Sequence, residues 1–514
     1  MSFKLTPLNF KIGFWIILLV GIGLRLYYMM APETRLSADE AVYGVQALNI
    51  LQGERSVFYY NQNYTGTLSA FVTAAFFGLF GIHDYLVKLP IFLFSIGFLF
   101  SSYFLAKLVF NSRNYALLSL LLTAITSPFW MNWTTRAGTG YPETMVFGNL
   151  IFILIIKNVY DKLNSRAQTV SFFLMGIFAG LGYWVQPTII YYLLPSAAFV
   201  FFWKPKIFLT RLFLAGILGF VLGSLTVIVF NINHSNLNTQ SLFHKPFGVK
   251  KAMVEFFTVG LPIMFGLRKP FSRVDFSTLL TYLVSGIYLL AFGWLLVKRL
   301  LDVLKTLSFG LITLTPRLKI AFSLQPVDLI LLFSLSVFII FSFSSPFNQF
   351  IEEPRYIGPL YTALPILIVF LVKEIKERFN KGLAMGLYLI VLGTQIFGLT
   401  QVPVGSFVSQ VDLKETIQTL REKNIKYVDT HALVSYHLVL ESGEEIIAAT
   451  RDNPPIEARY PEYRRLVNTA PLEEKGLLLD HQQQLVPCQK DLLKQHGPCQ
   501  ETKLKNGFYL YTWR

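Results

Sequence analysis

Ser37-Ala38-Asp39-Glu40-Ala41-Val42-Tyr43-Gly44 places two adjacent carboxylates directly after the first long apolar segment of this chain. Ionisable side chains are costly at the edge of a hydrocarbon layer, and they are kept there when they serve a function. We therefore interpret the acidic pair, Asp39 and Glu40, as the group that the rest of the chain presents to a substrate at a membrane surface.

The acidic pair also begins a predicted helix. Ser37 followed three residues later by Glu40 is a capping box, and Gly53 is a stop signal, so the sequence predicts a helix over residues 38–52. Capping accounts for Glu40 but gives no role to Asp39. Helical spacing gives two faces: a polar one with Asp39, Tyr43 and Gln46, and an apolar stripe that can lie on the bilayer, with Val42, Val45, Leu48 and Leu51.

The composition indicates a membrane protein that crosses the bilayer many times. Of the 514 residues, 53% are hydrophobic and 15% are charged, whereas globular domains have roughly 25% charged residues. The net charge of +15 comes largely from Lys and Arg in short loops between apolar segments, where such residues set membrane topology. This distribution argues against a nucleic-acid partner.

Apolar segments predict an all-α protein with about eleven transmembrane helices. They lie near residues 12–30, 87–106, 115–132, 144–160, 170–186, 187–203, 212–232, 278–297, 327–343, 357–372 and 384–402. The segment at 67–81 is shorter than the ~20 residues that a span needs, so we expect a juxtamembrane helix in the first outer loop. With that assignment, five basic loops fall on the same side as the N-terminus, which the positive-inside rule makes cytoplasmic.

The composition changes after Pro403, which predicts two domains: a transmembrane catalytic domain over 1–402 and a small extracytoplasmic α/β domain over 403–514. In the second, the pattern predicts a helix over 412–426, strands over 445–450 and 476–479, and a hairpin turn at 505–508. Cys488 and Cys499 form a disulfide if this side is oxidising, and otherwise remain reduced thiols.

Several motifs resemble those of the GT-C integral-membrane glycosyltransferases, in particular the family that includes protein O-mannosyltransferases and lipid A aminoarabinose transferases. The likeness covers roughly the first 190 residues and reappears late in the chain. It rests on Asp39-Glu40 with Tyr43-Gly44, Tyr60-Asn61-Gln62-Asn63-Tyr64-Thr65-Gly66, Phe80-Gly81, Lys88-Leu89-Pro90 and Pro354-Arg355-Tyr356. The resemblance implies a polyprenyl-phosphate-linked sugar donor, a site on the outer face of the plasma or inner membrane, an inverting transfer, and Asp39 as the catalytic base.

Basic residues at the outer membrane boundaries supply candidates for holding the donor phosphate. Arg136 and Arg355 fall there, and guanidinium groups bind phosphate through two parallel hydrogen bonds. The other candidates are Glu40 as a catalytic or orienting group and, for substrate binding, Tyr43, Gln62, Tyr64, Tyr141, Glu143 and Tyr356. Structural alternatives remain for two of them: Glu143 as a residue near a helix N-terminus, and Arg355 as the partner of Glu352 or Glu353.

The requirement for a metal stays open at this stage, and no other cofactor is expected. Asp39, Glu40 and Glu143 could supply oxygen ligands for Mg²⁺ or Mn²⁺, but the outer loops contain no Asp-x-Asp and no His- or Cys-rich spacing. The chain also lacks a P-loop and a dinucleotide fingerprint, which argues against a nucleotide sugar as the direct donor.

The sequence therefore predicts a hexosyl or pentosyl transferase that moves a sugar from a polyprenyl-phosphate carrier to a lipid, glycan or protein acceptor. The main alternative is a multispan lipid or sugar transporter or flippase, which would place ionisable residues in mid-membrane rather than at one interface. A non-catalytic scaffold with the same fold is the second alternative, and it would tolerate replacement of Asp39.

Overall fold

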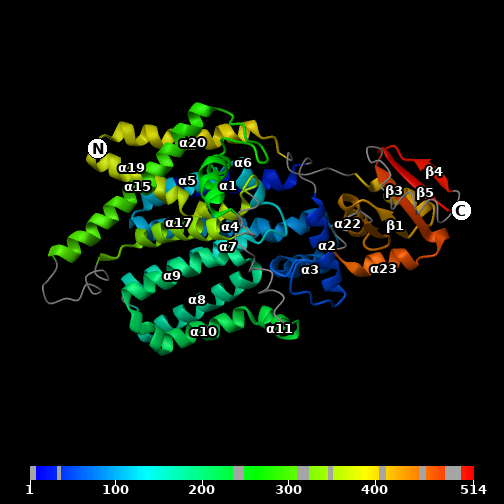
Figure 1. The fold of residues 1–514 in the computed structure, drawn as a ribbon, viewed down its shortest axis with the longest axis horizontal. Coiled ribbons are helices and arrows are strands. Elements are labelled where there is room, and N and C mark those ends of the chain that lie inside the picture. The colour runs from blue at the N-terminus through cyan, green and yellow to red at the C-terminus, as the bar shows by residue number, and fades with distance from the viewer. Residues whose placement is uncertain are drawn as a thin grey trace. The chain divides into compact units, whose positions relative to one another are not determined.

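A computed structural model describes residues 7–31, 36–161, 163–234, 248–309, 323–344, 351–404, 412–450, 459–480 and 499–513. The described chain forms long helices and one small sheet (Figure 1). It divides into two compact units. Unit 1 comprises Met1–Tyr28, Ile91–Thr135 and Thr139–Pro403, and unit 2 comprises Met29–Pro90, Arg136–Gly138 and Val404–Arg514.

Unit 1 contains most of the membrane-spanning candidates. Seven described helices are long and apolar enough to cross a bilayer: α1 (Pro7–Met30), α4 (Asp84–Phe110), α7 (Tyr141–Tyr160), α8 (Ser165–Val185), α15 (Thr278–Phe309), α17 (Pro326–Phe343) and α20 (Lys381–Gln401). Two bent pairs raise the number to nine within the described ranges. They are α10 (Arg211–Gly223) with α11 (Leu225–Asn233), bent by 64°, and the 3-10 helix η5 (Arg355–Thr362) with α19 (Leu364–Arg378), bent by 42°. The end of α1 and the start of α4 belong to unit 2.

Two of the expected spans are shorter helices in the structure. The segment expected at 115–132 is α5 (Arg113–Ala124) followed by α6 (Pro128–Trp133), and that at 187–203 is the 3-10 helix η2 (Pro187–Ile189) with α9 (Ile190–Trp203). Pro128 explains the first break, because proline disfavours helical geometry in the residue before it and opens a new helix well. The remaining short helices of this unit are η3 (Pro205–Leu209), α13 (Val249–Glu255), η4 (Phe256–Gly260) and α14 (Leu261–Met264).

Helices α8 and α10 pack closely through glycines and lie side by side in Figure 1. A Cβ atom on Gly180 would lie 2.4 Å from the carbonyl oxygen of Phe220, and one on Gly223 would lie 2.4 Å from that of Ile177. Small residues at such contacts let helix backbones approach inside a membrane, where packing replaces the hydrophobic effect as the driving force. The glycines therefore fix the distance between these two helices.

Unit 2 combines α2 (Ala38–Leu51) and α3 (Leu68–Phe80) with an α/β layer. Its five-stranded sheet has the order β2-β1-β3-β5-β4, in which β2, β1 and β3 are parallel and β3, β5 and β4 are antiparallel. The strands are β1 (Tyr427–Thr430), β2 (Ile447–Thr450), β3 (Lys475–Asp480), β4 (Gln500–Lys503) and β5 (Phe508–Thr512). The helices are α21 (Lys414–Glu422), α22 (Ala432–Glu441) and α23 (Pro461–Thr469), with the 3-10 turn η6 (Leu472–Glu474).

Most local expectations for unit 2 are confirmed. The helix predicted at 38–52 is α2, the juxtamembrane segment at 67–81 is the thirteen-residue α3, and the two predicted strands are β2 and β3. The predicted hairpin turn joins β4 to β5, with Gly507 at a φ of 91°. Cys488 lies outside the described residues, so its pairing with Cys499 stays a prediction.

Three of the four residues in the apolar stripe of α2 do not lie on the bilayer as expected, whereas the fourth, Leu51, is 47% exposed. Val42, Val45 and Leu48 are at most 5% exposed, because α2 packs against α3 and α22 within unit 2. The contact with α22 is close: a Cβ atom on Gly44 would lie 2.6 Å from Cδ2 of Leu440. The C-terminal part of the chain thus covers the face that the sequence assigned to lipid.

The glycine contact predicts a strong effect of Gly180→Leu. The new side chain would meet the backbone of α10, and overpacking of this kind costs about 1–3 kcal/mol or more. We expect a lower thermal unfolding midpoint of the purified protein in detergent. Gly293→Leu on α15 is the control, because a Cβ atom there meets nothing within 4 Å, and an equal loss in both variants would contradict this role of the glycine.

His437 on α22 predicts that stability falls in mild acid. Burial lowers its pKa from 6.5 to about 4, and the nearby Glu40 carboxylate offsets only part of this shift. Between these values the unfolded chain binds a proton that the folded chain does not, so stability is lost as pH falls from about 6.5 to 4, at about 1.4 kcal/mol per pH unit. The difference between melting curves at pH 7 and pH 5 should become smaller in His437→Gln. It should stay in a His83→Gln control, because the His83 side chain is exposed. Equal pH dependence of wild type and His437→Gln would refute this role of His437.

Candidate active site

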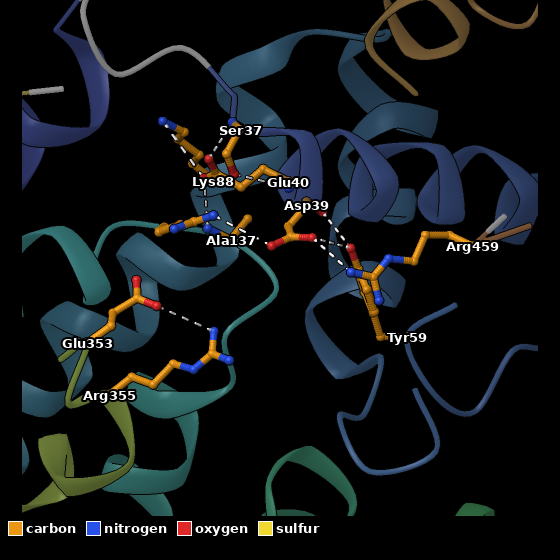
Figure 2. A network of polar contacts seen from close by, with 10 residues as sticks. Ser37, Asp39, Glu40, Tyr59, Lys88, Ala137, Glu353, Arg355 and Arg459 are labelled. Atoms are coloured by element: carbon orange, nitrogen blue, oxygen red, sulfur yellow. Dashed lines mark hydrogen bonds and ion pairs between the residues drawn. The ribbon is translucent and has the colours of Figure 1, made fainter. Parts of the chain in front are cut away.

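The acidic pair lies in the first turn of α2, where its two carboxylates have different surroundings (Figure 2). The Glu40 side chain is 1% exposed, whereas that of Asp39 is 53% exposed. The predicted capping box is present: Ser37 N donates to Glu40 Oε2 at 2.8 Å, and Glu40 N donates to Ser37 Oγ at 3.4 Å. The helix start therefore fixes the direction in which Asp39 projects.

Glu40 also ties α2 to a distant segment. Its other oxygen, Oε1, accepts a hydrogen bond from the backbone N of Ala137 at 2.9 Å and lies 3.8 Å from Nζ of Lys88. Both carboxylate oxygens are thus engaged by backbone N–H groups, and a buried charge is stable only when it is paired and hydrogen-bonded in this way. Through this contact Glu40 positions Arg136, the residue before Ala137.

Asp39 is surrounded by a hydroxyl and two guanidinium groups. Its Oδ1 accepts from the Tyr59 hydroxyl at 3.3 Å and lies 3.3 Å from Nη2 of Arg459 (Figure 2). Its Oδ2 lies 3.6 Å from Nη2 of Arg136. Burial, followed by the charge of Asp39, raises the pKa of Tyr59 well above 10. The Tyr59 hydroxyl therefore stays protonated and acts as a donor to the carboxylate.

Sequence reasoning did not select Arg459 or Tyr59. Arg459 is 420 residues from Asp39, and no local motif in the C-terminal region points to the acidic pair. Tyr59 directly precedes the Tyr60–Gly66 motif, and this position is the one feature of the sequence that could have pointed to it. Arg459 enters the site because α22 and the chain before α23 belong to the same compact unit as α2.

Three of the predicted substrate-binding residues lie near this network in unit 2. Tyr43 is buried, its hydroxyl donates to the carbonyl oxygen of Gly66 at 3.2 Å, and its ring stacks on that of Tyr59 at 6.0 Å. Gln62 and Tyr64 lie partly exposed on the loop that follows Tyr59. Tyr43 therefore supports Tyr59, while Gln62 and Tyr64 keep surface that a substrate could contact.

Gly138 allows the Arg136–Gly138 segment to approach Tyr43. It has a φ of 74°, in the left-handed region that glycine favours, and a Cβ atom on it would lie 3.1 Å from the Tyr43 ring. This agrees with the expectation that glycines in this loop permit a close backbone approach.

Four other predicted substrate-binding residues lie in unit 1: Tyr141, Glu143, Arg355 and Tyr356. The Arg355 guanidinium lies over the rings of Trp133 and Tyr356, 5.5 and 5.3 Å from their centroids, and 4.0 Å from Glu353. Tyr356 meets Tyr141 edge to face at 6.3 Å. Glu143 is buried in the first turn of α7, which agrees with the alternative that it is a residue near a helix N-terminus.

The acidic pair does not have the form of a divalent-metal site. Among the residues that the structure describes, no group of three His, Cys, Asp or Glu side chains could hold a metal ion. The groups around Asp39 are guanidinium and hydroxyl donors, and both oxygens of Glu40 already accept backbone hydrogen bonds. We therefore assign no step to a metal.

Comparisons with known proteins give matches at the level of fold. No family model and no curated protein matches the sequence. The structure is similar to ArnT from Cupriavidus metallidurans bound to undecaprenyl phosphate, with a TM-score of 0.58, 11% identity and 98% of each chain covered. The apo state of that protein matches with a TM-score of 0.59, 12% identity and 97% of each chain covered.

An oligosaccharyltransferase from Archaeoglobus fulgidus, in complex with Zn and sulfate, is also similar. Its TM-score is 0.52 at 14% identity, and the match covers 91% of this chain and 68% of that one. The resemblance that the motifs suggested is thus confirmed in three dimensions: this chain has the fold of the GT-C membrane glycosyltransferases.

Proposed function

We propose that this protein transfers a hexosyl or pentosyl group from a polyprenyl-phosphate donor to a lipid, glycan or protein acceptor on the outer face of the membrane. The observation that carries the proposal is the half-exposed Asp39 carboxylate, held at a capped helix start between two guanidinium groups. The fold, shared over nearly the whole chain with a protein that binds undecaprenyl phosphate, supports the donor class.

The chemistry follows from the groups around Asp39. The carboxylate takes the proton of the acceptor hydroxyl or amine as the acceptor atom bonds to the anomeric carbon. The bond from that carbon to the phosphate oxygen breaks, and the electron pair leaves with the polyprenyl phosphate. Attack from the face opposite the phosphate inverts the configuration of the sugar.

Arg136 is the proposed ligand of the departing phosphate, because a guanidinium binds a phosphate through two parallel hydrogen bonds and offsets its growing charge. Glu40 is the proposed positioning residue, since it holds the backbone of Ala137 next to Arg136. Gln62 and Tyr64 are proposed to contact substrate, with Tyr43 as support. Tyr141, Glu143, Arg355 and Tyr356 in unit 1 stay substrate-binding candidates on sequence grounds.

The membrane orientation belongs to the same proposal. With the N-terminus in the cytoplasm, the basic loops follow the positive-inside rule and the acidic pair faces the outer side. Residues 403–514 are then an extracytoplasmic domain. A lipid-linked donor cannot easily leave the bilayer, so a site at the outer interface meets the sugar where the carrier holds it.

Asp39→Asn tests the base assignment. The amide keeps the shape of the side chain but accepts a proton poorly, so we expect sugar transfer to fall by about 10²- to 10⁴-fold. The measurement is loss of sugar from radiolabelled lipid-phosphate donor in proteoliposomes, with Asp412→Asn on the exposed surface as control. An unchanged rate in Asp39→Asn would refute the assignment of Asp39 as the catalytic base.

Glu40→Gln tests the positioning role. The amide nitrogen cannot accept from Ser37 N or Ala137 N, so one buried backbone donor loses its partner, at a cost of about 1–3 kcal/mol. We expect a lower melting temperature and a donor KM that rises more than kcat falls, because Arg136 is displaced while Asp39 remains. A collapse of kcat at unchanged stability and KM would instead make Glu40 a direct participant.

A further inference from the structure

Arg459 is held in a defined place next to the acidic pair by the residue that follows it. Tyr460 N donates to the hydroxyl of Tyr436 at 2.8 Å, and the Tyr460 ring packs against those of Tyr60 and Tyr463 at 4.7 and 4.8 Å. These contacts join the chain entering α23 to the loop after α2, all within unit 2. Arg459 therefore lies next to a packed part of unit 2, at the entry to α23.

The Arg459 guanidinium lies in a largely enclosed position. Its side chain is 11% exposed, it lies over the Tyr59 ring at 5.2 Å, and it contacts Asp39 at 3.3 Å (Figure 2). Arg136, 15% exposed, contacts the other oxygen of the same carboxylate at 3.6 Å. Two enclosed guanidinium groups from distant segments thus converge on one carboxylate that is itself half exposed.

The distances show that neither contact is a tight pair. Some ion pairs elsewhere in the same protein are shorter: Arg268 lies 2.7 Å from Asp275, and Arg299 lies 2.6 Å from Asp328. Optimal charge-assisted hydrogen bonds measure about 2.7–2.9 Å. The contacts of 3.3 and 3.6 Å at Asp39 are longer than this optimum, which is the geometry expected of cations that can turn from the carboxylate to a second anion.

We propose that Arg459 is a donor-binding residue, which grips the phosphate of the lipid-linked sugar together with Arg136. This inference rests on the proposed function and extends it by giving the C-terminal region a direct part in substrate binding. In the state described here the guanidinium contacts Asp39, and it turns to the phosphate when the donor enters. The turn releases the Asp39 carboxylate from its contacts with the two guanidinium groups, so that it can meet the acceptor.

Donor binding thereby prepares the base. Arginine suits this change of partner because its planar fork can bind two phosphate oxygens at once and the group stays charged throughout. The ring of Tyr59 keeps the guanidinium near the site in both positions, because a cation over an aromatic face is attracted by about 0.5–2 kcal/mol.

A purely structural pair between Arg459 and Asp39 gives the opposite expectation for one variant. If Asp39 only anchored Arg459, removing the charge at Asp39 would loosen the guanidinium and weaken phosphate binding. If Asp39 and the phosphate compete for the guanidinium groups, Asp39→Asn leaves phosphate binding as tight as in the wild type or tighter.

The experiment measures binding of undecaprenyl phosphate to the purified full-length chain by isothermal titration calorimetry in detergent, with undecaprenol as the probe that lacks phosphate. We expect Arg459→Ala to weaken binding of undecaprenyl phosphate at least tenfold and Arg459→Lys to weaken it less, because the lysine keeps the charge without the fork. Asp39→Asn should not weaken it. Arg465→Ala is the matched control, since Arg465 lies on α23 with an exposed guanidinium paired with Glu462.

Unchanged binding in Arg459→Ala, or equal weakening in Asp39→Asn and Arg459→Ala, overturns the inference. Melting curves of each variant identify any loss of binding that comes from unfolding. If Arg459→Ala unfolds, unchanged binding in Arg459→Lys overturns the inference instead. The proposed function fails in a different way: wild-type protein would bind undecaprenyl phosphate no better than undecaprenol, or it would release no sugar from the lipid-phosphate donor.

Discussion

The hydrogen bonds of the Glu40 carboxylate are the constraint on which the site depends. One oxygen accepts from the backbone of Ser37 and closes the first turn of α2, and the other accepts from Ala137, 97 residues away in sequence. A carboxylate that is 1% exposed is stable only with such partners, so the helix start and the distant segment hold each other in place. The two adjacent acids thereby take different roles: Glu40 is buried and both of its oxygens accept hydrogen bonds, whereas Asp39 is half exposed.

Helix α2 extends this division of roles to a whole element. Three residues of its apolar stripe, Val42, Val45 and Leu48, pack against α3 and α22, while its first turn carries the acidic pair. The same packing that buries the stripe brings the C-terminal region, with Arg459, to Asp39. Burial of apolar surface and assembly of a charged site are therefore one event in unit 2, because the helix that gains stability from the contact also carries the carboxylates.

The features that depend on a few neighbouring residues could be predicted from the sequence. The capping box at Ser37, the helix after it, the short helix at 67–81 and the C-terminal strands each follow from a local pattern, and each is confirmed. What covers the α2 stripe could not be predicted, because lipid and a protein helix are equally apolar partners. Arg459 could not be found either, since its contact with Asp39 depends on tertiary packing across 420 residues.

The origin of the charges explains why the site takes this form. Lys88 comes from α4, Arg136 from the segment before α7 and Arg459 from the chain before α23, and each contacts one member of the acidic pair. A metal ion would bring its charge from solution, whereas these cations arrive only when three segments fold around α2. Guanidinium groups also keep their charge when they change partners, which the proposed turn of Arg136 and Arg459 from Asp39 to the phosphate requires. The electrostatics of the proposed reaction are therefore a consequence of the folding of unit 2, and the exposed carboxylate of Asp39 is the proposed point of contact with the substrate.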